Sequence, residues 1–192
     1  MIQTLFSEKE RSYLGPELRP HFILSEFGVR GSAVVAFQGP CRVETDHLVD
    51  WEDRLEGDRI ESLLMVHFLG EFFGITLREG VLLQRLLMAQ MAERLGLHLR
   101  TQADESRRQV VRSGNDLYWA ERKLSVSIVT ASPVSVLLHA GVNVDPTGAP
   151  VAAVGLNELG VDASDFARGI LESFSREMTG VDWACAKVRP VV

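Results

Sequence analysis

ERKLSVSIVTASPVSVLLHAGVNVD (residues 121–145) alternates apolar and polar side chains over two runs that flank a Ser-Pro turn signal. A period of two is typical of a β-strand that is covered on one face. Two such runs joined by a tight turn predict a β-hairpin. A turn centred on Ser132 would pair Ser125 with His139 and would bring the polar side chains of both strands to one face.

This expected polar face collects one ammonium, one imidazole, one carboxamide and two hydroxyls, from Lys123, Ser125, Ser127, His139 and Asn143. Because the hairpin holds no carboxylate beside Lys123, its ammonium is suited to a phosphate, a carboxylate or the oxygen of a polarised carbonyl. The hydroxyls suit the orientation of a small ligand. Polar outward faces are also common in antiparallel sheets. The pattern alone therefore leaves a site wall and a solvated face equally open.

The rest of the chain predicts a short strand, two helices, a block of strands and a terminal helix. Strands are expected over 3–10, 32–40 (ended by Gly39-Pro40), 97–102, 107–114 and 115–121, and helices over 58–74, 77–96 and 162–180. Gly114-Asn115 is a hairpin signal between two of these strands. No linker divides the sequence. We expect one domain over 1–192, of the α+β class, with helices packed on a mostly antiparallel sheet.

Composition limits the partners. A formal net charge of -6 argues against a broad nucleic-acid-binding surface and leaves a local basic patch open. No apolar run is long enough to span a bilayer, and the N-terminus lacks a signal-peptide pattern. Two distant cysteines, Cys41 and Cys185, indicate a reduced, cytoplasmic protein. We therefore expect a small-molecule ligand and no membrane partner, and a homodimer is left open.

The acidic segment DHLVDWEDRLEGD (46–58) is a candidate metal site, because hard cations prefer clustered oxygens. Asp50, Glu52 and Asp53 are its candidate ligands for Mg²⁺. A solvated acidic loop is the favoured alternative, since no established loop spacing is present.

Two further side chains have both a functional and a structural interpretation. In the expected helix over 58–74, His67 lies on the apolar side, where it is either a ligand-binding group or a satisfied core histidine. Cys41 is either a nucleophile with His139 or His67 as its base, or a buried inert thiol, which is the favoured interpretation.

Two segments resemble lipoyl octanoyltransferases: RGSAVVAFQGPCRV (30–43) and RKLSVSIVTASPVSVLLHAGVNVD (122–145). Lipoate–protein and biotin–protein ligases have related strands. Taken together with LVDWED (48–53), these segments resemble more closely the uncharacterised domain-of-unknown-function family 366. The resemblance covers roughly 28–178 and implies the biotin/lipoate-ligase fold, which is related to class II aminoacyl-tRNA synthetases.

The resemblance also implies site residues. Lys123 matches the lysine that contacts the activated acyl group, and His139 and Asn143 match the following strand. Two groups match the rest of the binding loop: Arg30 and Gly31 at its start, and Gln38, Gly39 and Pro40 at a His-Gly-Pro turn in which Gln replaces His. The transferases' nucleophilic cysteine has no counterpart in GAPVAAVGLNELG (148–160), and the ligases' glycine-rich elements are missing.

The sequence therefore predicts a cytoplasmic protein that binds an activated acyl, aminoacyl or nucleotide-linked carboxylate for acyl transfer or ligation. Lys123 and His139 are the expected catalytic residues. The cofactor is open, with ATP and Mg²⁺ as the candidate. A non-catalytic ligand-binding or assembly module is the alternative, favoured by the missing cysteine. A third hypothesis is a metal-dependent hydrolase built on His67 and the acidic segment.

Overall fold

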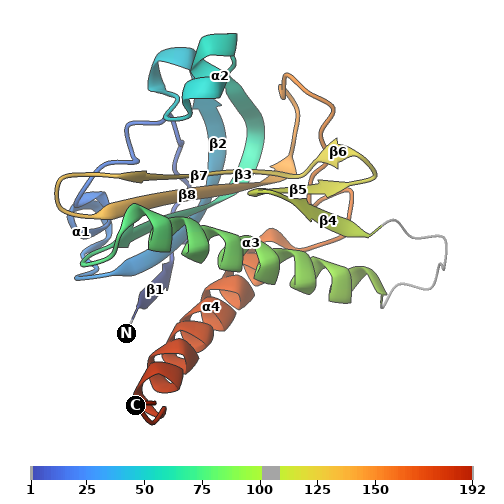
Figure 1. Ribbon diagram of the computed structural model, residues 1–192. Helices are drawn as coiled ribbons and strands as arrows, with labels where there is room; N and C mark the ends of the chain where they lie inside the picture. Colours follow the sequence, from blue (N-terminus) through green and yellow to red (C-terminus); the bar gives the residue numbers. More distant parts are fainter. Residues whose placement is uncertain (1, 101–108, 192) are drawn as a thin grey trace.

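Figure 1 presents the computed structural model, which describes residues 2–100 and 109–191. Its main sheet has the strand order β1-β2-β3-β8-β7. The bounds of these strands are Gln3–Phe6, Ala33–Val43, Ile60–Phe72, Val136–Asp145 and Ser125–Ala131. Only β1 runs parallel to its neighbour, β2. The expected α+β class with a mostly antiparallel sheet is confirmed.

Two long helices cover one face of this sheet. Figure 1 shows α3 (Leu77–Arg100) lying along β7 and β8, and α4 (Ala163–Ala186) crossing it and extending away from the sheet. Asp162 caps α4 by accepting a hydrogen bond from the Asp165 amide. Buried apolar side chains from both helices and the sheet form the larger core. Within the described residues, no helix is both long and apolar enough to cross a membrane.

The expected helix over 58–74 is wrong, because this segment forms β3, the central strand. β3 pairs with β2 on one side and β8 on the other, and both of its faces are buried over most of its length. A strand covered on both faces reads as a near-continuous apolar run without alternation. Its apolar residues therefore also matched a helical spacing.

A second, three-stranded sheet lies beside the hairpin: β4 (Val110–Ser113), β5 (Asp116–Trp119) and β6 (Arg122–Lys123). The expected hairpin at Gly114-Asn115 is confirmed by the pairing of β4 with β5. The strand expected over 97–102 is wrong up to residue 100, where the chain is still helical. Its last two residues lie outside the described residues.

Strand β2 does not end at Gly39-Pro40 but continues to Val43, with a register shift between Gly39 and Cys41. The chain before β2 runs alongside this irregular part, where the amide of Arg11 donates to the Gln38 carbonyl and the amide of Tyr13 to the Pro40 carbonyl. Short helices complete this side: α1 (Phe22–Phe27), η1 (Thr45–His47) and α2 (Trp51–Glu56). Gly39 is needed here because a Cβ on it would lie 1.9 Å from the Arg11 carbonyl oxygen.

The hairpin β7–β8 forms as expected but in another register. Ala131 pairs with Val136 across a four-residue connection, so Ser125 faces Val142, and His139 faces Ile128. The expected partner of Ser125 was His139, which is three residues from its actual partner, Val142. An odd shift exchanges the two faces of a strand. The polar residues of β7 and β8 therefore lie on opposite faces of the sheet.

The second core lies on the face opposite α3 and α4, beneath the N-terminal segment and α1. It encloses His67, which is completely buried next to Tyr13 and Phe37. Burial lowers the pKa of His67 to about 4, while its hydrogen bond to the Gly39 carbonyl acts in the opposite direction. The folded protein therefore holds a neutral imidazole at this position.

We predict that Gly39→Ala lowers the free energy of unfolding by more than about 2 kcal/mol, because the added methyl group must displace the Arg11 backbone. Gly96→Ala is the matched control. Nothing lies within 4 Å of a Cβ at Gly96 inside α3, so this change should stabilise the protein by up to about 1 kcal/mol. Urea denaturation measures both, and equal stabilities for the two variants would contradict the close contact.

We also predict that acid destabilises the fold through His67. In the unfolded chain this imidazole has its ordinary pKa of 6.5. Between pH 6.5 and about 4 the unfolded state therefore binds a proton at His67 that the folded state does not bind. The free energy of unfolding should fall by about 2 kcal/mol from about pH 7 to about pH 5 through this residue. His67→Asn should remove the part of the slope that His67 contributes, while the part due to His139, whose pKa burial also lowers, remains. A wild-type profile that is already flat would refute the prediction.

Candidate functional site

A pocket of about 380 Å³ opens where β3, β7 and β8 meet the segment 48–61 and the loop that follows β8. Part of its lining is apolar, from Met65, Val126 and Ile128. The rest is strongly charged. Six carboxylates and two cations line it, namely Asp50, Glu52, Asp53, Asp58, Glu61 and Asp116 with Arg59 and Lys123.

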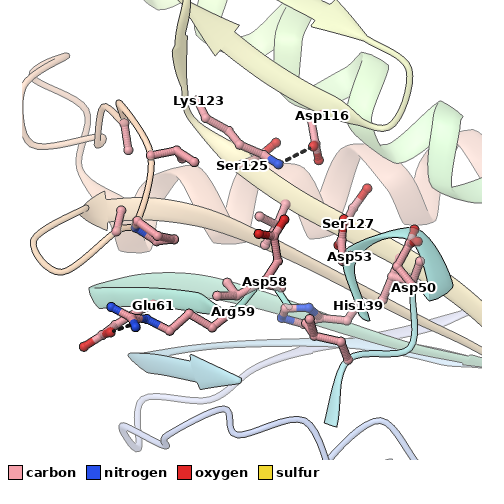
Figure 2. Close-up of a pocket in the computed structure, with 18 of the residues that line it drawn as sticks. Asp50, Asp53, Asp58, Arg59, Glu61, Asp116, Lys123, Ser125, Ser127 and His139 are labelled. Carbon is pink, nitrogen blue, oxygen red and sulfur yellow. Dashed lines mark ion pairs between the residues drawn. The ribbon is translucent and has the colours of Figure 1, made fainter. Parts of the chain in front are cut away.

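Lys123 forms an ion pair with Asp116, with 2.9 Å between Nζ and Oδ2. Figure 2 shows this pair and the Arg59–Glu61 pair on different sides of the pocket, with Asp58 between them. Lys123 comes from β6 and Asp116 from β5, so the small sheet supplies both. In the described part of the chain, Asp116 is the hydrogen-bond partner of Nζ, and the other N–H groups of the ammonium are available to a ligand.

The charges around Lys123 keep it protonated. Burial lowers its pKa, but attraction to Asp116, the hydrogen bond between them and the negative charge of Asp53 outweigh burial, so the pKa is raised. The pKa of Asp116 is raised by burial, against the opposing effect of Lys123. Burial and the neighbouring Asp50 also raise the pKa of Asp53. The pocket therefore presents one permanent ammonium beside carboxyl groups that ionise less readily than usual.

Ser125 and Ser127 line the pocket, but their hydroxyls are engaged on the side of α3. The Ser125 hydroxyl accepts from the Leu117 amide at 2.8 Å, and the Ser127 hydroxyl donates to the Asn115 carbonyl at 2.6 Å. Gln84 of α3 donates to the Ser127 hydroxyl at 2.9 Å. These bonds fasten the small sheet to β7, which is how Asp116 comes to face Lys123.

His139 and Asn143 reach the pocket from β8. His139 is 2% exposed, and its Nε2 lies 3.1 Å from Nδ1 of His67, whose own Nε2 lies 3.1 Å from the Gly39 carbonyl. The ring of Tyr13 stacks on His139, with centroids 3.7 Å apart. The Asn143 side chain donates to the Lys123 carbonyl at 3.3 Å. His67 is thus behind the pocket wall, in contact with a residue that lines it.

The structure does not bring the remaining loop residues to this pocket. Arg30 and Gly31 precede β2 at the far end of the sheet, where the Arg30 carbonyl accepts from Gln3. Gln38 lies on the opposite face and donates to Ser164 at 2.8 Å. Gly39 and Pro40 contact the N-terminal segment. None of these five residues lines the pocket.

The acidic segment is partly helical and contributes directly to the pocket. Asp50 caps α2 by accepting a hydrogen bond from the Glu52 amide at 2.8 Å, and Asp53 lies one turn further along. All three carboxylates line the pocket. However, within residues 2–100 and 109–191 no three His, Cys, Asp or Glu side chains are grouped closely enough to hold one metal ion.

Cys41 is 1% exposed and lies outside the pocket lining. Burial, followed by the negative charge of Glu17, raises the pKa of its thiol to about 12. A thiolate is therefore strongly disfavoured here, which supports the inert interpretation.

Sequence reasoning missed Asp116, Tyr13 and Arg59. Asp116 follows the Gly114-Asn115 turn signal and was a position at which a pocket carboxylate could have been suspected. No pattern identifies Tyr13, which lies in an irregular segment and contacts His139 only through the tertiary fold.

Comparison with solved structures places this geometry among known folds. A protein of unknown function from Pyrococcus horikoshii is 34% identical with a TM-score of 0.89, and the match covers 100% of both chains. The biotin acetyl coenzyme A carboxylase synthetase of Helicobacter pylori, with bound biotinylated ATP, is 12% identical with a TM-score of 0.54 over 91% of this chain and 75% of that one.

Plasmodium falciparum LipL1 in complex with lipoate is 9% identical with a TM-score of 0.51, over 100% of this chain and 65% of that one. At such identities these two similarities establish the fold, and the expected biotin/lipoate-ligase-like architecture is confirmed. The family described as a domain of unknown function, DUF366, matches residues 2–189, so this chain belongs to that family.

Proposed function

We propose that the pocket binds an activated carboxylic acid and transfers its acyl group to an amine or hydroxyl acceptor, with Lys123 on the carbonyl oxygen. The acceptor forms a bond to the carbonyl carbon, the bond from that carbon to the thiol or alcohol leaving group breaks, and the leaving group departs with the proton that the acceptor loses. The observation that carries this proposal is the protonated Lys123, held at 2.9 Å from Asp116 with N–H groups left for a ligand. An ammonium in a partly dry site stabilises negative charge that develops on a carbonyl oxygen. The apolar side chains of Met65, Val126 and Ile128 suit the carbon chain of an acyl group.

The charge of the pocket favours an acyl group that carries little negative charge. A free triphosphate would meet six carboxylates and only two cations, both already paired. The described residues also lack a grouped set of metal ligands that would offset this repulsion. The residues present therefore do not fit ATP well, and we propose no step through it. A thioester or ester fits better than a nucleotide-linked acid.

A second candidate is a non-catalytic ligand-binding module on the same fold. It is favoured by Cys41, whose buried thiol lies outside the pocket lining. In this case Lys123 would hold a carboxylate without reaction.

Two turnover assays separate these candidates. Acyl transfer is measured as thiol released from a panel of uncharged acyl thioesters of N-acetylcysteamine in the presence of amine and hydroxyl acceptors, and ligation as pyrophosphate released from ATP and Mg²⁺ with biotin, lipoate, octanoate or amino acids. We expect release of thiol. Release in either assay excludes the non-catalytic module. A co-purified ligand in the native mass spectrum without turnover favours the module. If neither a ligand nor turnover is found, both candidates are contradicted.

Substitution of Lys123 tests its role. We predict that Lys123→Met lowers kcat/KM for acyl transfer by about a hundredfold or more, as loss of one oxyanion-stabilising group does elsewhere. Because this change leaves Asp116 without its cation, the double variant Lys123→Met with Asp116→Asn should be equally inactive and better folded.

Arg122→Met is the matched control. Arg122 is next to Lys123 in β6, but its side chain pairs with Glu158 at 2.9 Å and is not part of the pocket lining. Activity of this variant should stay within about threefold of wild type, since no catalytic stabilisation is removed. A Lys123 variant that loses only thermal stability, with kcat/KM unchanged, would refute the proposal.

A further inference from the structure

The buried pair of histidines beneath the pocket has a defined arrangement of protons. The Gly39 carbonyl can only accept a hydrogen bond, so the His67 Nε2 that lies 3.1 Å from it must carry a proton. Burial lowers the pKa of His67 to about 4, so the ring is neutral near pH 7 and carries no second proton. The Nδ1 atom of His67 is therefore an acceptor.

The protonation of His139 is fixed by its contact with His67. Its Nε2 lies 3.1 Å from the acceptor Nδ1 of His67, so Nε2 of His139 must be the donor. Burial, followed by repulsion from His67, places the pKa of His139 well below its ordinary value, so this ring is also neutral. Its remaining nitrogen, Nδ1, is left with an unprotonated lone pair. The opposite tautomer would set two lone pairs against each other inside the core.

The other ring nitrogen of His139, Nδ1, is not sealed in the core. Nδ1 has no hydrogen-bond partner among the described residues. The fully buried side-chain atoms that lack a partner in this part of the chain are Arg11 Nε and Asp116 Oδ1, and Nδ1 of His139 is not one of them, so it is not fully buried. His139 lines the pocket, and we infer that Nδ1 faces this open space. The stacked ring of Tyr13, inclined at 9° to the imidazole, holds the plane of His139.

We propose that Gly39, His67 and Tyr13 lock His139 in the tautomer that presents Nδ1 to the pocket as a hydrogen-bond acceptor, which selects ligands that donate an N–H or O–H there. Gly39 and His67 are positioning groups, since they act through His139. Lys123 donates from the small sheet and His139 accepts from β8. The selected class is therefore an acyl compound that also carries an amide, amine or hydroxyl group able to reach His139 while its carbonyl oxygen lies at Lys123. This assignment of ligand class rests on the proposed function, whereas the tautomer does not.

Nitrogen NMR tests the tautomer on the ligand-free protein, independently of any turnover. In protein labelled with ¹⁵N-histidine, long-range correlation spectra distinguish a protonated ring nitrogen from a bare one. At pH 7 we expect His139 with Nε2 protonated and Nδ1 bare. A proton on Nδ1, or a charged ring, would overturn the proposal even if acyl transfer were observed.

Substitution of His67 tests its positioning role. In His67→Asn the side-chain oxygen can still accept from His139, so the tautomer should be retained. In His67→Phe this acceptor is lost, and a mixture of tautomers is expected. His47→Gln, an exposed substitution, is the control. If His67→Phe leaves His139 entirely in one tautomer, His67 does not position it; should that variant fail to fold, the wild-type spectrum still decides the tautomer.

A pair of small probes tests the selection of donors. Acetamide and acetone differ by an NH₂ in place of a CH₃, so only acetamide donates an N–H, and both fit the pocket volume of about 380 Å³. Acetamide should shift the Nδ1 signal of His139 in the direction of hydrogen bonding, and acetone should not. Equal responses to the two probes, including no response to either, would overturn the selection.

Discussion

The burial of β3 on both faces is the constraint on which the rest of the structure depends. This strand separates the two cores, and it pairs with β2 and β8 along most of its length. One face packs under α3 and α4. The other carries His67 towards the N-terminal segment and Met65 into the pocket. If the segment were a helix, β8 would lose the neighbouring strand that positions His139 and Asn143, and the pocket would not form.

The pocket combines an ammonium that is permanently charged with surroundings that are mostly acidic. An isolated lysine in a dry site would tend to lose its proton, but Asp116 prevents this. Asp116 in turn is kept in place by the hydroxyls and amides that join β5 to β7. The positive charge of Lys123 therefore depends on a structural hydrogen-bond network in the wall of the pocket, which the short sequence around the lysine does not reveal.

The sequence predicted the α+β class, the two long helices and the hairpin, because each rests on a local pattern. It also proposed Lys123 and His139 as catalytic residues, which stays a prediction, and the structure places both in the pocket lining. It failed where the outcome depended on tertiary contacts. Apolar spacing could not distinguish the doubly covered β3 from a helix, and a connection of four residues rather than three moved Ser125 to the other face. The contact of Gly39 with Arg11 is equally invisible in the sequence.

The pocket lining is drawn from chain segments that lie as far apart as Leu48 and Ala153. Closing loops of such length is entropically unfavourable until most of the sheet has assembled. The pocket should consequently be among the last features to form as the chain leaves the ribosome, after β8 has docked on β3. A compound bound in it would bind only the completely folded protein, and would therefore stabilise the whole fold rather than any fragment of it.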